Sequence, residues 1–513
     1  MSEVKQGTAP VEFWSSVEYG TFLKGLVREF LRDAKTEAAV PPRSELLATR
    51  YPLLATAQQR FAVSESDYRQ ARGTWARLRM RWRCYVGYPN LLHRRIRREP
   101  APAAMVVCTN TFYAPWVAMR SARKRGIPVV HWMFDLFPDV LVLAGKLKPG
   151  SLGERWLRRW VRAMFDGAAA NVFLGQRLLA YAEAKFGPIP RAVVIPVGCD
   201  AAPFAGMEPR DRRPDRECGN QENGNGGRTA DSGNRTTEGN EGRRTFCCSA
   251  ESTARSASET ADGGRQEPTG NRTPDTGVAE GDAARPTVTE EGAPVRVLYC
   301  GNFGRMHEVD TVVAALRGGV PNGVRLDFRG NGAGFQTLAA ATAELRSCQA
   351  GTAQRGGSGT QEIRRGERNG EAVTGDRGAG SEQLRLGGSL PEREWLDAMA
   401  AADVALVTMK RGAEGIVMPS KTYSAMAAGQ AILAVCPRES DLADLVAAHD
   451  CGWVVEPGDV AGLRAVLDSL ASRGAEVLTK RRNAWRAARE CYDQRVLAER
   501  WREVLRGFAC RET

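Results

Sequence analysis

The sequence predicts an α/β protein built from two doubly wound, Rossmann-like domains with long disordered insertions. Short apolar runs alternate with helical segments in two separate parts of the chain, which is the pattern of parallel sheets covered on both faces. A tract nearly free of aliphatic residues, about 205–293, separates these two parts. The length of 513 residues is too great for one hydrophobic core, so two or three domains are expected.

The first 100 residues are basic and mostly helical in pattern, and we expect them to form the N-terminal region of the first domain. Within 72–98, arginines alternate with Trp75, Trp82, Tyr85 and Tyr88. Such a mixture suits an anionic membrane interface, and it also suits nucleic acid. A solvated amphipathic helix packed on a sheet is the third interpretation.

Residues 101–204 have the alternation expected of the first Rossmann-like domain. The predicted strands are 104–108, 127–132, 168–174 and 191–196. The predicted helices are 114–125 and 156–165. No first strand with a glycine-rich loop is identifiable, so residues 1–99 either contain it in degenerate form or lack it.

Two segments are rich in Gly, Asn, Thr, Glu and Arg and too poor in aliphatic residues to offset the entropy of ordering. The first, 205–293, is predicted to be a disordered linker. The second, about 350–382, is predicted to loop out of the second domain, where long insertions cost little free energy.

Residues 294–475 are predicted to form the second Rossmann-like domain. Its predicted strands are 295–299, 324–328, 404–407 and 431–435, and its predicted helices include 309–316 and 395–401. The remaining residues, 476–513, are predicted to be C-terminal helices.

Composition narrows the classes of function. The net charge of +12 and the pI near 9.3 indicate attraction to nucleic acid, an acidic membrane surface or phosphorylated substrates. Twelve scattered cysteines without a CxxC pair, and four separated histidines, argue against a zinc site, and we predict no metal and no cofactor. No apolar run is long enough to span a bilayer and the N-terminus has no apolar signal core, so a cytoplasmic protein is expected.

The segment 414–429 has the strongest chemical signal. Glu414 leads into the turn Pro419-Ser420-Lys421, which opens a helix of small residues ending at Gly429. The first N–H groups of a helix lack internal partners, so its start attracts anions, and a lysine and a serine add a charge and a hydroxyl donor. Such a site suits a diphosphate. An ordinary loop–helix–strand unit is the alternative interpretation.

Two further glycine turns follow predicted strands of the same domain. The first contains Gly301, Asn302, Gly304 and the forked donor Arg305. The second contains Gly330 and Gly332. Each turn alone is weak evidence of a site. Three in successive strand–helix units predict a ligand cleft at the carboxyl ends of the strands.

Residues 295–455 resemble the donor-binding domain of retaining-type, nucleotide-sugar glycosyltransferases with the GT-B fold. The resemblance implies that Arg305 and Lys421 neutralise the donor diphosphate and that Glu414 orients the sugar. It implies further donor contacts from Gly301, Asn302, Gly304, Gly330, Gly332, Pro419, Ser420 and Ser424. Ser424 stands at or near the position of the family's second glutamate.

Residues 102–204 resemble the acceptor-side domain of the same family. His131 and Asp135 follow one of its strands and are the candidates to touch the sugar or the acceptor. In the alternative interpretation Asp135 caps a helix and His131 is a strand-end residue.

The resulting prediction is a metal-independent glycosyltransferase with a nucleotide-sugar donor. The Pro-Ser-Lys variant resembles enzymes that glycosylate lipid-linked sugars for surface polysaccharides, which implies a lipid-linked acceptor and a peripheral position on the membrane. A sugar-nucleotide epimerase and a non-catalytic, membrane-associated partner of a transferase remain as alternatives. Nucleic-acid binding ranks third.

Overall fold

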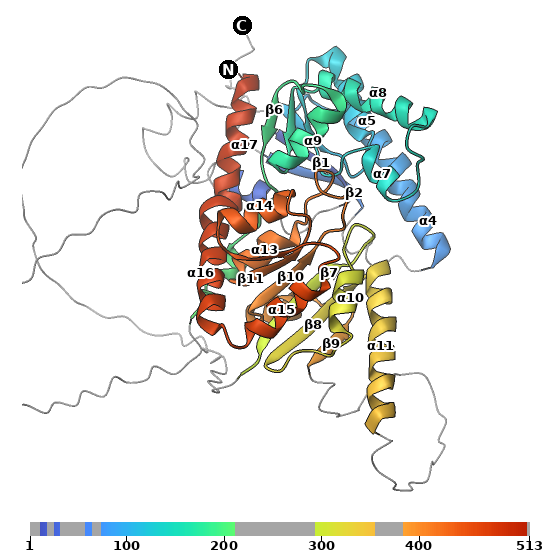
Figure 1. Ribbon diagram of the computed structural model, residues 1–513. Helices are drawn as coiled ribbons and strands as arrows, with labels where there is room; N and C mark the ends of the chain where they lie inside the picture. Colours follow the sequence, from blue (N-terminus) through green and yellow to red (C-terminus); the bar gives the residue numbers. More distant parts are fainter. Residues whose placement is uncertain are drawn as a thin grey trace, which may run out of the picture. The chain divides into compact units, whose positions relative to one another are not determined.

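The computed structural model describes residues 11–17, 25–30, 57–63, 73–210, 293–353 and 383–509. These residues form two six-stranded sheets in which every described strand pairing is parallel (Figure 1). The predicted fold class, two doubly wound Rossmann-like domains, is confirmed.

The first sheet has the strand order β2-β1-β3-β4-β5-β6. Its strands are β1 (Val11–Val17), β2 (Ala57–Val63), β3 (Ala104–Cys108), β4 (Val129–Trp132), β5 (Ala170–Phe173) and β6 (Ala192–Val194). Its helices are α4 (Thr74–Trp82), η2 (Arg83–Gly87), α5 (Tyr88–Arg98), α6 (Ala114–Ala122), η3 (Arg123–Arg125), α7 (Asp139–Leu143), α8 (Leu152–Gly167), α9 (Gln176–Phe186) and η4 (Ala202–Phe204).

The strand β1 settles where the first strand of this domain lies. It is inside the first 99 residues and pairs with β2 on one side and β3 on the other. Glu12 interrupts its apolar pattern, yet the carboxylate is fully buried and accepts hydrogen bonds from the Trp14 indole and the Arg95 guanidinium. Pairing makes this burial tolerable, because an unpaired carboxylate would be very costly there.

The second sheet has the order β12-β11-β10-β7-β8-β9. Its strands are β7 (Val295–Asn302), β8 (Val324–Asn331), β9 (Leu384–Gly387), β10 (Val404–Thr408), β11 (Ala431–Val435) and β12 (Gly452–Val455). Its helices are α10 (Asp310–Leu316), α11 (Ala333–Ala353), α12 (Glu392–Ala401), α13 (Lys421–Ala427), α14 (Asp441–Ala448) and α15 (Val460–Leu470). The strand order reverses between β7 and β10, and such a reversal opens a crevice at the carboxyl ends of the strands.

The two predicted insertions fall mostly outside the described residues. Of the linker 205–293, only 205–210 and 293 are described. Of the insertion at about 350–382, α11 occupies the first part because this helix continues to Ala353.

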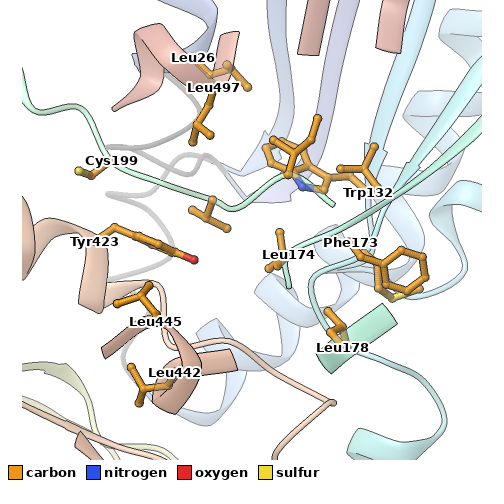
Figure 2. Packing of buried hydrophobic residues seen from close by; sticks show 14 of the residues in the cluster. Leu26, Trp132, Phe173, Leu174, Leu178, Cys199, Tyr423, Leu442, Leu445 and Leu497 are labelled. Atoms are coloured by element: carbon orange, nitrogen blue, oxygen red, sulfur yellow. The ribbon is translucent and has the colours of Figure 1, made fainter. Parts of the chain in front are cut away.

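The two sheets belong to one compact unit and share a hydrophobic core cluster. Figure 2 shows Leu174 and Leu178 of the first half in the same cluster as Tyr423, Leu442 and Leu445 of the second. These apolar side chains bury surface between the halves, which stabilises their contact.

The C-terminal helices contact both halves. The helix α16 (Gly474–Cys491) packs against α13 and β11 of the second half. The helix α17 (Gln494–Ala509) places Trp501 against Trp132 and Phe13 of the first sheet, with ring centroids 4.7 and 5.8 Å apart. Between these helices, Asp493 forms a parallel bridge with Cys199.

Candidate active site

A cavity of about 460 Å³ lies between residues of the two halves. On the side of the second sheet it is bounded by the ends of β7 and β10, the two strands at which the order reverses. The strands β10 and β7 are paired at Val404 with Val297 and at Ala405 with Leu298, whereas β7 remains paired with β8 as far as Asn302. The cavity is therefore at the position where an open parallel sheet binds its ligand.

Seven of the predicted site residues line this cavity together. They are Asp135, Gly301, Asn302, Pro419, Ser420, Lys421 and Ser424. Residues from three separate turns and from both halves of the chain are thus brought to one place.

Lys421 is the cationic side chain of this wall. Its Nζ lies 2.6 Å from the Tyr299 hydroxyl and 4.0 Å from the centre of the same ring. Burial lowers the pKa of Lys421 to about 7, because the charged ammonium loses hydration there. The Tyr299 hydroxyl donates in turn to the carbonyl of Asn302, 3.0 Å away, so Lys421 is held against the β7 turn.

Gly301 faces this lysine, and its backbone conformation, more than space, favours glycine. A Cβ added at Gly301 would lie 3.7 Å from the Lys421 Nζ, and the φ of 132° at this residue favours glycine. Glycine is required at positions 330 and 332 for a different reason. Cβ atoms there would collide with backbone atoms of Gly301 and Phe303, so these glycines allow the ends of β7 and β8 to approach closely.

The start of α13 contributes less helix dipole than the sequence predicted. The helix has only seven residues, and the N–H groups of Thr422 and Tyr423 already donate to the carbonyls of Pro419 and Ser420. A dipole from two turns is small. The charge of Lys421 and the hydroxyl groups of Ser420 and Ser424 therefore carry more of the anion preference at this wall.

His307, from the loop after β7, also lines the cavity. Its Nδ1 donates to the carbonyl of Thr408 at 2.8 Å, which leaves Nε2 as the hydrogen-bond acceptor of the neutral ring. Burial, followed by the charge of Lys421, lowers the pKa of His307 to about 3. The ring is thus neutral at physiological pH.

Five predicted residues of the second half do not line the cavity: Gly304, Arg305, Gly330, Gly332 and Glu414. Arg305 is exposed on the β7 loop, and Gly304 is beside it. The Glu414 carboxylate accepts a hydrogen bond from the Gly412 N–H at 2.6 Å. Its neighbours Val417 and Met418 reach the cavity instead.

The two candidates of the first half separate in the structure. Asp135 lines the cavity, and burial raises the pKa of its carboxyl to about 6. His131 is fully buried in β4, where Nδ1 meets the Asn171 side chain at 3.2 Å and the ring lies 5.5 Å from Phe165. The structure therefore brings Asp135, but not His131, to the cavity.

Sequence reasoning missed part of the wall. Val197, Gly198 and Cys199 line the cavity from the segment after β6, and Thr408 and Met409 line it at the end of β10. The rule that selected the β7 turn, namely that ligands bind at strand ends, could also have selected Thr408. Among the described residues, no group of three or more His, Cys, Asp or Glu side chains is arranged to hold a metal ion.

Comparisons with known proteins give a family match in the first half. Residues 44–202 match the family described as Glycosyltransferase Family 4. A probable glycosyltransferase of Pseudomonas aeruginosa, WbjE, is 38% identical over 88 residues, which are 17% of this chain and 22% of WbjE. The chain thus matches about a fifth of the length of that curated relative.

Solved structures match almost the whole chain. Sucrose-phosphate synthase from Thermosynechococcus elongatus has a TM-score of 0.54 at 13% identity, covering 98% of this chain and 99% of that one. WaaG, a glycosyltransferase involved in lipopolysaccharide biosynthesis, has a TM-score of 0.50 at 14% identity, covering 96% and 99%. HepE of Anabaena in complex with UDP has a TM-score of 0.50 at 11% identity, covering 97% and 100%.

Two parallel sheets with a cavity at the strand reversal, together with these likenesses, define a protein with the GT-B fold of glycosyltransferases. More particularly, residues 44–202 are similar to Glycosyltransferase Family 4.

Proposed function

We propose that this protein transfers a sugar from a nucleotide-sugar donor to an acceptor in glycan synthesis, with the donor bound in the cavity at the ends of β7 and β10. The single observation that carries the proposal is the convergence of Lys421, the Gly301 turn and Asp135 on one cavity. A UDP complex of the similarly folded HepE supports a nucleoside diphosphate as the ligand.

In this proposal Lys421 binds the diphosphate. Its ammonium provides a positive charge where the leaving group develops negative charge, and burial of the lysine strengthens this attraction. Ser420 and Ser424 offer hydroxyl groups to oxygens of the donor. Arg305, exposed on the loop that carries Gly301 and Asn302, is the second candidate cation, and it would reach the donor by side-chain rotation.

We assign Asp135 to the acceptor side of the cavity, where its carboxylate would accept a hydrogen bond from a sugar hydroxyl. Glu414 remains the candidate for orienting the transferred sugar. Retention of the anomeric configuration, a lipid-linked acceptor and a peripheral position on the membrane are the finer parts of this proposal. They rest on the resemblance of 414–429 to enzymes of that kind.

Nucleotide binding tests the proposal most directly. We expect UDP or GDP, or a sugar nucleotide of one of them, to raise the melting temperature of the full chain, because a ligand that binds only the folded state stabilises it. Lys421→Ala should remove most of this shift. Lys480→Ala is the matched control, because Lys480 also lies over an aromatic ring, 5.4 Å from the centre of Trp453, and is not part of the cavity wall.

The alternatives give different results. If the protein is folded and no nucleotide raises its melting temperature, a non-catalytic partner subunit would be favoured. Conversion of the sugar nucleotide without any acceptor would indicate an epimerase. The variant Ser424→Glu restores the residue type typical of the family, so tighter nucleotide binding in this variant would explain a weak wild-type signal.

A further inference from the structure

Exposed hydrophobic side chains gather on one part of the first domain. Among the residues that the structure describes, the large hydrophobic side chains with high exposure all come from α4, η2, α5 and α8. They are Trp75, Leu78, Trp82, Tyr85, Val86, Leu91, Leu152 and Trp156. Trp75 and Leu152 are 82% and 81% exposed. Isolated exposed apolar residues are ordinary, but a group of eight from neighbouring elements indicates an interaction surface.

Ring contacts connect the two ends of this group, which we call the aromatic–arginine surface. On α8, Trp156 lies 4.9 Å from Trp160, and Trp160 stacks on Tyr113 at 6.0 Å. The Tyr113 hydroxyl donates to the backbone carbonyl of Tyr85 in η2. These contacts link α8 to η2, and the helices α4, α5 and α8 lie on the same side of the first half (Figure 1).

The charge of this surface has one sign. Between residues 74 and 98 there is no aspartate or glutamate, and six arginines are exposed: Arg77, Arg79, Arg81, Arg94, Arg97 and Arg98. On α8, Arg155 and Arg159 are exposed, whereas Glu154 turns inward to Arg158 at 2.7 Å. Positive charge around exposed tryptophans and aliphatic side chains complements an acidic, partly apolar partner.

We propose that the aromatic–arginine surface docks the protein on an anionic lipid bilayer. Tryptophan and leucine side chains would enter the interface, and the arginines would pair with lipid phosphates. Nucleic acid fits less well. Bases stack on flat rings, and the exposed aliphatic side chains Leu78, Val86 and Leu152 have none. Aliphatic side chains are stabilised when they leave water for an apolar medium, such as the interior of a bilayer. No described helix combines the length and apolar character needed to cross a bilayer.

Ring contacts also extend from the surface toward the loop that carries Asp135. Phe112 lies 5.7 Å from Trp160 and stacks on Phe137 at 5.1 Å. Phe137 is two residues from Asp135, which lines the cavity. A row of half-buried rings thus runs from the docking surface to a loop residue two positions from Asp135. This part of the inference rests on the proposed function: a lipid-linked acceptor would reach Asp135 along this row.

Flotation of the full chain with vesicles tests the docking surface without any assay of activity. We expect binding to vesicles of phosphatidylcholine mixed with phosphatidylglycerol and much weaker binding to phosphatidylcholine alone. The triple variant Trp75→Ser/Trp82→Ser/Trp156→Ser should reduce the partition coefficient at least about tenfold. Arg77→Ala/Arg79→Ala/Arg81→Ala should reduce it by about as much and weaken its salt dependence.

The controls separate docking from folding and from function. Arg317→Ala/Arg438→Ala removes two exposed arginines of the second domain and should leave flotation unchanged. Circular dichroism and the nucleotide-induced melting shift should be the same in every variant, so failure of nucleotide binding would refute the proposed function and not the docking surface.

Four results would overturn the inference. The first is a folded wild-type protein that does not float with anionic vesicles, and the second is equal flotation of the triple variant. The third is a dimer in size-exclusion chromatography that the triple variant abolishes while no vesicles are bound, which would assign the surface to a second copy. Salt-sensitive retention on an oligonucleotide without vesicle binding would assign it to nucleic acid.

Discussion

The carboxylate of Asp441, at the start of α14, accepts a hydrogen bond from the backbone N–H of Leu178, 3.0 Å away on α9. Its other oxygen accepts from the N–H of Arg177 at 2.9 Å. An acidic residue of the second half thus caps a helix of the first half. Residue 175, which precedes α9, must be glycine here, because an added Cβ would lie only 2.2 Å from the Asp441 carboxylate.

We expect Asp441→Ala to lower the free energy of unfolding by about 1–2 kcal/mol, the usual cost of losing a helix cap. Urea denaturation measures the change. The control is Asp444→Ala, which breaks only the exposed ion pair with Arg177 and should cost about 1 kcal/mol or less. If both variants lowered the free energy of unfolding equally, the cap would stabilise the protein no more than an exposed ion pair does.

The low pKa of Lys421 predicts pH-dependent nucleotide binding. The ammonium that attracts a diphosphate loses its proton as the pH rises through about 7, so affinity for UDP should fall between about pH 6 and pH 8.5. Calorimetric titration of wild type and Lys421→Met measures the effect. Because the terminal phosphate of UDP titrates identically in both experiments, the difference between the two proteins is the contribution of Lys421. Parallel pH profiles would contradict the prediction.

Asp135 predicts a separation of binding from transfer. Asp135→Asn should slow transfer at least about tenfold and change nucleotide affinity less than about twofold, because we assign its carboxylate to the acceptor and not to the nucleotide. The pKa of Asp135 is raised to about 6, so wild-type transfer should decline as the pH falls below about 6 while the carboxylate becomes protonated. This acidic limb should be absent from Asp135→Asn. Loss of nucleotide binding in the variant would refute the assignment.

The buried ion pair of Glu12 and Arg95 predicts a large stability effect. Their closest atoms are 2.6 Å apart, and both side chains are buried. Arg95→Met removes the closer of the two cations beside Glu12, leaving Arg60 at 3.5 Å, and should cost up to about 3–5 kcal/mol. The double variant Glu12→Met/Arg95→Met should recover much of that loss in urea denaturation. A cost below about 1 kcal/mol for Arg95→Met would mean that Glu12 is compensated by other groups.

The fold was predictable because short, continuous apolar runs alternate with helical segments. This pattern is typical of parallel strands that are buried on both faces of a sheet. The strand β1 was not, because Glu12, Ser15 and Ser16 break its apolar run and the partner that neutralises Glu12 is more than eighty residues away.

Local sequence also identified the turns that line the cavity, such as Gly301 and Ser420, because strand-end position is a local property. It did not separate Asp135 from His131. The direction of each side chain depends on the loop after β4, whose Leu136 N–H donates to the Ile416 carbonyl of the other half.

The chain passes between the two halves at Cys199 and again at Asp493, and these two residues lie side by side in one parallel bridge. If one half rotated against the other, the backbone at these two neighbouring crossings would have to absorb the change. Gly198, with a φ of 62°, and Cys199 are also part of the cavity wall. Such a rotation would therefore move residues of the cavity wall, so we expect a ligand in the cavity to restrict the angle between the halves.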